Sequence, residues 1–434
     1  MDKVLFLTTS GCHLCEQAWG VMERLPLLSP VEIEIVDIAD DDALIEEYGE
    51  QIPVILSEAD QKELVWPFSL ADLRLFFEGL PGNLPLNWLT QSCQTINKSA
   101  IKAAHARQQQ LTKPAGSLGI LEPLVEVLAG QQGREKPSLN NVAITIFTGD
   151  HGVVNQGVSA YPAEVTTQMV GNFVNGGAAI SVLAKEQNCH LSILDMGTSQ
   201  SPLGWPGVHD FSAGQGTADF TEQPALTKSQ LDWCLAAGAA HIDSLLNDEL
   251  DLFIAGEMGI GNTTAAAAIC CALTGLPAEY LAGRGTGLND AGLIRKQNII
   301  NKALDKYSES LKQPLEALRY LGGFEIAAIV GAVIRCAQRG VPVLVDGFIV
   351  TAAALVACRL LPAVREWLLF AHKSAEPGHQ LIMEYLEVEP LCDFGMRLGE
   401  ASGAAVVLPL LRMTCELHSQ MHTFAEAGVA TSGE

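Results

Sequence analysis

The sequence predicts an α/β protein in which helices cover both faces of a parallel sheet, preceded by a smaller α/β unit. From about residue 140 onward, short apolar runs typical of buried strands alternate with longer helical patterns, as a parallel sheet requires. Residues 1–80 differ from the rest in charge, with 17 acidic and 4 basic residues against 33 and 22 in the other 354. The first fifth of the chain is therefore expected to be a separate unit.

The first 80 residues form a complete βαβαββα pattern. Strands are expected at residues 3–9, 31–38, 54–57 and 63–66, and helices near residues 13–25, 42–48 and 69–79. The turn after the first strand carries Cys12 and Cys15 in a Cys-x-x-Cys motif, so the layout is thioredoxin-like. Cys12 is expected at a helix N-terminus, where the dipole favours a thiolate, and Cys15 one turn later is placed to resolve a mixed disulfide.

A second element supports this layout. Ile52-Pro53-Val54 opens a strand with proline, which is typical of a cis peptide beside such a dithiol. With both elements, residues 1–80 resemble the glutaredoxin-like family, which implies thiol–disulfide redox chemistry. No tyrosine stands between the cysteines and no Gly-Gly pair precedes the last helix, so the use of glutathione is left open. A structural zinc site on Cys12, His13 and Cys15 is the alternative, although it lacks a fourth nearby ligand.

The run from Asp251 to Leu273 is the most informative stretch of the larger part. A buried strand at residues 251–255 leads into a glycine-rich turn at 256–262, and Thr263 and Thr264 then open an alanine-rich helix. Free N–H groups and the dipole at a helix N-terminus favour an anion, and glycines let backbone approach a phosphate. The turn lacks the Gly-Lys-Ser/Thr ending of a triphosphate P-loop. The alternative is a plain glycine turn with Glu257 in solvent.

Other predicted strands also end in polar residues. Because ligands of open α/β sheets bind beyond the carboxyl ends of the strands, these side chains are expected to approach one crevice. A single strand-terminal aspartate is more often a helix cap, but five such ends together favour a site. The residues concerned are Asp150, His151, Asp195, Glu257, Asp346 and His372.

Bulk properties exclude several classes of protein. The chain of 434 residues is long enough for two or three domains and offers no run of about 18 apolar residues, so no membrane span is expected. Its start lacks a secretory signal, and 11 cysteines, several of them in apolar runs, favour reduced thiols in the cytoplasm. A net charge of −24 argues against nucleic acid as a partner.

Beyond about Leu84 the chain carries a series of long motifs in a fixed order. These are residues 111–119, 149–152, 157–162, 165–169, 256–264, 283–287, 321–325, 343–348, 372–376 and 396–404. Together they resemble the nicotinate-nucleotide–dimethylbenzimidazole phosphoribosyltransferase family over roughly 350 residues. The resemblance implies a Rossmann-like core at about 140–375, a small helical domain from about 86–135 and the C-terminal helices, and a homodimer. Residues 81–85 would then be the linker.

The implied reaction transfers phosphoribose from nicotinate mononucleotide to a benzimidazole nitrogen, with no cofactor and no metal. The resemblance assigns Glu400 as the base and Glu257 as a second acid. It further implies a set of substrate-binding residues: Gly259, Gly261, Asn262, Thr263, Thr264, Gly285 and Lys296 for the phosphate, Tyr161, Gln168 and Met258 for the acceptor ring, and Asp346. Without the resemblance, Glu400 would equally be a cap of a helix at residues 401–411.

Three other functions stay open at this point. One is phosphoribosyl transfer to another azole or to a purine. The second is a redox protein whose larger part only binds a nucleotide, and the third is a noncatalytic azole carrier. Neither of the last two requires both a buried base and a phosphate turn.

Overall fold

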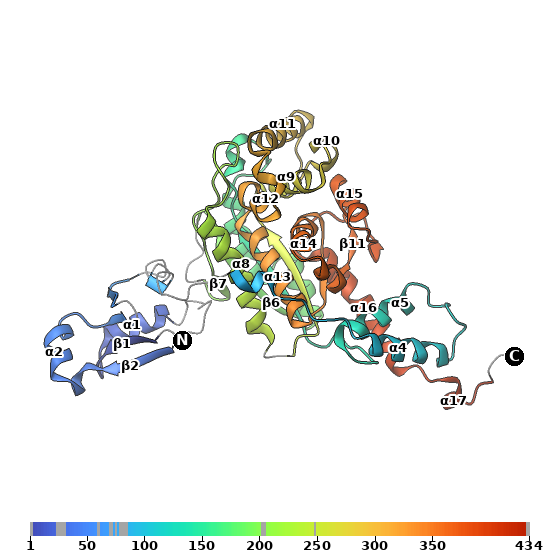
Figure 1. Ribbon diagram of the computed structural model, residues 1–434, viewed down its shortest axis with the longest axis horizontal. Coiled ribbons are helices and arrows are strands. Elements are labelled where there is room, and N and C mark those ends of the chain that lie inside the picture. The colour runs from blue at the N-terminus through green and yellow to red at the C-terminus, as the bar shows by residue number, and fades with distance from the viewer. Residues whose placement is uncertain are drawn as a thin grey trace. The chain divides into compact units, whose positions relative to one another are not determined.

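The computed structural model describes residues 3–22, 32–58, 61–68, 73, 76, 77, 86–200, 205–246 and 249–430. The chain divides into two compact units, Met1–Trp88 and Leu89–Glu434. Each unit has its own sheet (Figure 1). Each also has its own apolar core. The expected linker at residues 81–85 lies outside the described residues.

The first unit is built on a four-stranded sheet with the order β2-β1-β3-β4. Strand β1 is parallel to β2 and antiparallel to β3, and β3 is antiparallel to β4. This mixed sheet confirms the thioredoxin-like prediction. The predicted helix at residues 69–79 lies mostly outside the described residues. The elements are β1 (Lys3–Thr8), α1 (His13–Met22), β2 (Glu32–Asp37), α2 (Asp42–Tyr48), β3 (Val54–Ser57) and β4 (Glu63–Val65).

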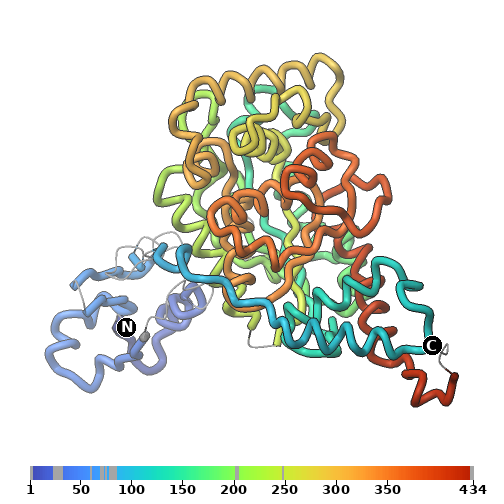
Figure 2. The backbone as a smooth tube through the Cα atoms, turned by 45° about the vertical axis from the view of Figure 1, so that its right-hand side comes forward, coloured from blue at the N-terminus to red at the C-terminus, as the bar shows by residue number. Residues whose placement is uncertain are grey.

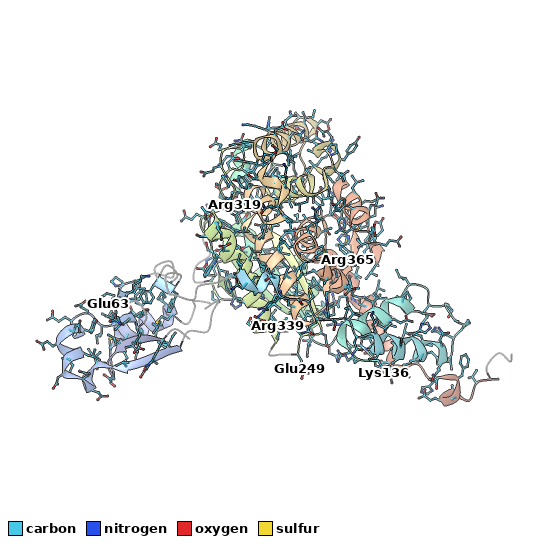
Figure 3. All side chains as sticks on the ribbon, viewed as in Figure 1. Glu63, Lys136, Glu249, Arg319, Arg339 and Arg365 are labelled. Carbon is cyan, nitrogen blue, oxygen red and sulfur yellow. A yellow bond between two sulfur atoms is a disulfide. The ribbon has the colours of Figure 1, made fainter. Side chains whose placement is uncertain are left out.

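The Cys-x-x-Cys motif lies at the start of α1, as expected. Cys12 and Cys15 are joined by a disulfide, so neither sulfur is available to a zinc ion in this state. The backbone N–H of Cys15 points to Cys12 Sγ at 3.2 Å, and Cys15 is buried while Cys12 is partly exposed. The Ile52–Pro53 peptide is cis, and Ile52 packs against the same apolar cluster as the two cysteines. Across the unit, Tyr48 donates a 2.7 Å hydrogen bond to Glu63, which links α2 to β4. Glu63 is labelled in Figure 3.

The second unit contains a six-stranded, fully parallel sheet with the order β10-β9-β8-β5-β6-β7. The chain starts in the middle at β5, runs outward to β7, returns to β8 and runs outward again to β10. This is the Rossmann-like arrangement that the resemblance implied. The strands are β5 (Val142–Gly149), β6 (His190–Gly197), β7 (Val208–Asp210), β8 (Leu252–Met258), β9 (Val343–Val345) and β10 (Leu368–Phe370).

Helices cover both faces of this sheet (Figure 2). On one face, β5 contacts α13 and Thr145 Oγ1 lies 2.9 Å from His241 Nε2 of α8. On the other face, Ile144 and Ile254 share a core cluster with Phe173 and Leu408. The first set of helices is α8 (Lys228–Leu245), α13 (Phe324–Arg339) and α14 (Phe348–Leu360). The second set is α6 (Glu164–Val174), α7 (Ala179–Glu186) and α16 (Ser402–Gln420).

A further group of helices gathers around α9, the helix that follows β8. It comprises α9 (Asn262–Thr274), α10 (Ala278–Leu281), α11 (Asp290–Tyr307), α12 (Pro314–Leu321) and α15 (Pro377–Tyr385). A two-residue pairing of β11 (His372–Lys373) with β12 (Cys392–Asp393) follows β10. Among the described residues, no helix is both long and apolar enough to cross a membrane.

A small helical part is built from both ends of the unit, as the resemblance implied. Helices α4 (Lys98–Gln110) and α5 (Leu121–Gln132) pack together, and α5 also contacts α16 (Figure 1). Arg107 of α4 donates hydrogen bonds to the carbonyl oxygens of His418, Ser419 and Met421. Helix α16 extends well past the expected end at residue 411 despite Pro409 within it. Its first turns cover β8 and its last turns belong to the helical part.

A chain that starts at Leu86 is expected to fold on its own. Residues just after this point are tied to the larger unit: Gln338 donates to the Gln91 carbonyl (3.1 Å), the Gln94 N–H to the Ala337 carbonyl (2.9 Å), and Trp367 Nε1–H to the Gln94 carbonyl (3.2 Å). A chain starting at Asn97 loses all three bonds and should melt several degrees lower, at about 1 kcal/mol per bond. Thermal melting followed by circular dichroism measures the folding and the melting temperature of both shortened chains. An insoluble product from Leu86 onward would show that the acidic unit is integral to folding.

Candidate active site

A cavity of about 570 Å³ opens at the carboxyl ends of β8, β9 and β10. Its walls come from five segments that are far apart in sequence: the loop after β5, the turn between β8 and α9, the loop before α11, the start of α14, and the chain between β12 and α16. The segment after β10 closes the remaining side with His372, Ser374 and Glu376. Nine of the predicted site residues line it: Tyr161, Glu257, Met258, Gly259, Gly261, Asn262, Thr263, Gly285 and Glu400.

The turn between β8 and α9 forms one end of the cavity. Gly261 has φ +99° and directly precedes α9, so the N-terminus of this helix faces the cavity. A Cβ at Gly261 would lie 2.7 Å from Val154 Cγ2, and one at Gly259 would collide with the Gly149 carbonyl. These glycines therefore let the turn pack closely on the loop after β5. They also leave the backbone of the turn accessible to a ligand. The end of the cavity is suited to an anion such as a phosphate.

Lys296 supports this turn from behind. It is fully buried on α11, where its Nζ donates to Thr263 Oγ1 (2.8 Å) and to the Gly283 carbonyl (3.1 Å). Burial lowers the pKa of Lys296 to about 8, and the Glu376 carboxylate acts in the opposite direction. Thr264 is also buried behind the turn. Lys296 and Thr264 thus belong to the anion end without lining the cavity itself.

Three carboxylates meet at the other end of the cavity. Glu257 is the penultimate residue of β8, Asp346 follows β9 and Glu400 lies just before α16, and all three are buried. A Cβ at Gly399 would lie 2.5 Å from Glu257 Oε1, which shows how closely the segment before α16 approaches this acid. Asp346 accepts the Ala404 N–H at 2.8 Å, and His372 Nε2 lies 3.8 Å from Asp346 Oδ1.

Burial raises the pKa of all three acids. The pKa of Glu257 lies well above its ordinary value, chiefly because of burial and then because of Asp346 and Glu400. Burial, with Asp346 second, raises the pKa of Glu400 to about 7. Burial also raises the pKa of Asp346, although His372 and backbone N–H groups oppose that shift. Near pH 7 Glu400 is therefore about half ionised, and its carboxylate form accepts a proton more readily than an ordinary glutamate does.

The backbone that carries Glu400 has an uncommon conformation. Gly399, Glu400 and Ala401 have φ values of 81°, 60° and 60°, so three successive residues are left-handed. For the two non-glycine residues this conformation costs on the order of 1–3 kcal/mol each. Such strain persists where surrounding contacts determine it, and here it turns the Glu400 side chain onto the cavity wall.

Apolar side chains form the slot beside these acids. Tyr161 is 51% exposed at its rim, and Met258 lies partly buried in its wall. Phe348 and Leu398 also line it, and the sequence reasoning did not single them out, although both belong to the long motifs 343–348 and 396–404. Gln168 is exposed on α6 and is not among the lining residues, so its contact with a ring stays a prediction.

The expectation that six strand-end residues meet in one crevice is only half right. Glu257 and His372 line the cavity and Asp346 lies directly behind it, but Asp150, His151 and Asp195 do not line it. Each of these three has a local partner instead. Asp150 accepts from the N–H and hydroxyl of Ser199 (both 2.7 Å), His151 pairs with Glu325 (2.7 Å), and Asp195 accepts the N–H groups of Gly197 and Thr198. They therefore stabilise loops next to the site.

Comparisons with known proteins cover both units. A phosphoribosyltransferase family model matches residues 93–429, and a glutaredoxin-like domain model matches residues 3–78. The nicotinate-nucleotide–dimethylbenzimidazole phosphoribosyltransferase of Pseudomonas putida strain KT2440 is 56% identical over 343 residues, which are 79% of this chain and 98% of that protein. Its counterpart in Ectopseudomonas mendocina strain ymp is 55% identical over 350 residues, 80% of this chain and 99% of that protein.

Solved structures give the same result. The crystal structure of the nicotinate-nucleotide–dimethylbenzimidazole phosphoribosyltransferase from Thermus thermophilus aligns with a TM-score of 0.73 at 41% identity, over 78% of this chain and 100% of that chain. The similarity therefore includes the whole length of that structure, together with the elements that form the cavity.

Replacing Glu400 by glutamine should stabilise the protein as the pH rises. Because the folded-state pKa is raised from 4.5 to about 7, the folded protein keeps a proton that the unfolded chain has already released between these values. Stability that is present at low pH is therefore lost as the pH rises toward 7, and Glu400→Gln removes that loss. In urea unfolding, the unfolding free energy of the variant relative to that of the parent should increase by about 2 kcal/mol between pH 5.5 and pH 8. Glu389→Gln, at an exposed glutamate, is the matched control. If both variants differ from the parent in unfolding free energy by the same amount at every pH, the raised pKa does not belong to Glu400.

Proposed function

The chain belongs to the nicotinate-nucleotide–dimethylbenzimidazole phosphoribosyltransferase family, and from this premise we propose that it transfers phosphoribose from nicotinate mononucleotide to 5,6-dimethylbenzimidazole. The products are α-ribazole 5′-phosphate and nicotinate, and the step belongs to the synthesis of the lower ligand of cobalamin. The observation that carries the proposal is the placement of Glu400 and the α9 N-terminus in one cavity.

The donor is held at the anion end. Its 5′-phosphate accepts hydrogen bonds from the turn at Gly259–Thr263 and faces the dipole of α9. Lys296 adds a positive charge behind Thr263 and so balances part of the negative charge of the phosphate. Among the described residues, no group of three or more histidine, cysteine, aspartate or glutamate side chains is arranged to hold a metal ion.

The acceptor ring lies between the apolar side chains of the slot, with one edge at the carboxylates. One ring nitrogen attacks C1′ of the ribose as the bond from C1′ to the nicotinate nitrogen breaks. The electron pair of that bond returns to the pyridine ring and cancels its positive charge. Attack from the face opposite the leaving group inverts C1′, and Glu400 takes the proton from the other ring nitrogen. Glu257, beside Gly399, holds the orientation of the acceptor.

We also infer that the working protein is a cytoplasmic homodimer. Leu410, Met413 and Leu417 form an exposed apolar stripe on one face of α16, as an interface between two copies would require. The many free cysteines favour a reducing compartment. In the first unit we propose thiol–disulfide chemistry, with Cys12 as the attacking thiol.

Glu400→Gln should lower turnover by about two to four orders of magnitude, as expected for loss of a general base. In the parent, kcat/KM should increase with pH up to about 7, because Glu400 loses its proton there. It should decrease above about 8, because Lys296 loses its charge. The variant should lack the acidic limb while binding nicotinate mononucleotide normally. Turnover is measured as the amount of product, identified by its mass, that forms from nicotinate mononucleotide and each of a panel of azole and purine bases. Near-normal turnover in the variant would remove Glu400 from this role.

Cys12 should be the most reactive thiol of the reduced protein. It is partly exposed at the N-terminus of α1, where the dipole favours its thiolate, whereas Cys15 is buried. Cys392 is a suitable control because it is also partly exposed but burial raises the pKa of its thiol. Alkylation at pH 7, read by mass spectrometry, should label Cys12 at least about tenfold faster than Cys392. Equal rates would mean that the first unit has the fold without the redox chemistry.

A further inference from the structure

Arg397 lines the cavity but has no role in the reaction described above. It lies on the segment between β12 and α16, three residues before Glu400, and it is exposed. Three glutamates line this cavity, whereas Arg397 is the one arginine or lysine among the described residues that line it. A direct ion pair between an anionic ligand and an arginine or lysine of this described lining therefore involves Arg397.

A hydrogen bond fixes the Arg397 side chain at the anion end of the cavity. Its Nη1 donates to the Gly285 carbonyl at 3.2 Å. Gly285 packs on the turn before α9, because a Cβ at Gly285 would lie 3.0 Å from Thr263 Oγ1 and 3.7 Å from Lys296 Nζ. Gly285 and Thr263 both line the cavity. The guanidinium is therefore bonded to the same glycine that lies against the turn suited to a phosphate.

This guanidinium has charge and donors left for a ligand. A guanidinium carries five N–H donors in a planar fork, and the Gly285 carbonyl takes one of them. Among the described residues no carboxylate pairs with Arg397, whereas Arg284 in the loop before α11 pairs with Asp290. A phosphate matches the fork, because two of its oxygens accept parallel hydrogen bonds from one guanidinium.

Lys296 leaves this contact to another residue. It is fully buried, it does not line the cavity, and its Nζ donates to Thr263 Oγ1 and to the Gly283 carbonyl. Its charge thus acts from behind the turn, through Thr263. Arg397 lies on the open side of the same turn, where a side chain can touch the ligand itself.

We propose that Arg397 binds the 5′-phosphate of the nucleotide donor directly and makes the site specific for a mononucleotide over the corresponding nucleoside. This inference rests on the proposed function, since it takes nicotinate mononucleotide as the donor. Arg397 and Glu400 belong to one short segment, so the contact with the phosphate also holds the stretch of chain that carries the base.

The test uses three donors that separate the two anionic groups of the substrate. Nicotinate mononucleotide has both groups, nicotinamide mononucleotide lacks the ring carboxylate, and nicotinate riboside lacks the phosphate. Each is titrated by calorimetry into the parent and into Arg397→Met, without acceptor. The variant should bind both mononucleotides about 10- to 100-fold more weakly, as expected for loss of hydrogen bonds to a charged group, and the riboside with the affinity of the parent. Arg397→Lys, which keeps the charge without the fork, should fall between the two.

The matched control is Arg295→Met. Arg295 is also exposed and also donates to a glycine carbonyl, that of Gly157 at 3.4 Å, but it does not line the cavity. This variant should keep every affinity of the parent. Melting temperatures identify a variant that fails to fold.

Three outcomes would overturn the proposal. In the first, Arg397→Met binds the mononucleotides as the parent does, and in the second it loses affinity for all three donors equally. In the third, the loss is confined to the two donors with a ring carboxylate, which would assign Arg397 to that group. Turnover of the parent with dimethylbenzimidazole is measured separately. Its absence would refute the proposed function, whereas the three binding outcomes would refute only the role of Arg397.

Discussion

The site depends on one close approach, that of the start of α16 to the ends of β8 and β10. Three glycines permit it. A Cβ at Gly256 would lie 2.6 Å from the Ala401 N, one at Gly399 would lie 2.5 Å from Glu257 Oε1, and one at Gly403 would collide with the ring of His372. Asp346 then fixes the helix by accepting the Ala404 N–H. Without this contact Glu400 would be a solvated residue at the end of a loop, and the cavity would lack a wall.

The same contact creates the electrostatic character of the site. Pressing α16 onto the strand ends removes water from Glu257, Asp346 and Glu400, and it brings like charges together. Both effects oppose folding at neutral pH, and the left-handed backbone at residues 400 and 401 adds to the cost. The extensive apolar core under α16, from Ala404 to Leu411, offsets it. The stability of this helix thus maintains an unfavourable arrangement of acids that chemistry requires.

Local pattern predicted the strands, the helix starts and the β8–α9 turn well, because each depends on residues close in sequence. It also placed Glu257 and Asp346 at strand ends. It failed for Asp150, His151 and Asp195, because their partners Ser199, Glu325 and Thr198 become evident only in the folded loops. Gly256 was expected in a glycine-rich turn, and no close contact was expected at Gly399 or Gly403, whereas all three permit contacts between segments far apart in sequence. Phe348 and Leu398 were missed for the same reason, since nothing in an apolar run shows which member faces a cavity.

Burial has opposite chemical consequences for the two kinds of acid in this chain. For Glu400, with an ordinary pKa of 4.5, it brings the pKa to about 7 and so produces a base suited to neutral pH. For Cys271, Cys358 and Cys415 it raises the pKa to about 12, so these thiols of the larger unit stay protonated and unreactive. Cys12 is different because it is partly exposed at a helix N-terminus. The thiol chemistry proposed for Cys12 and the proton transfer proposed for Glu400 thus belong to different units of the chain.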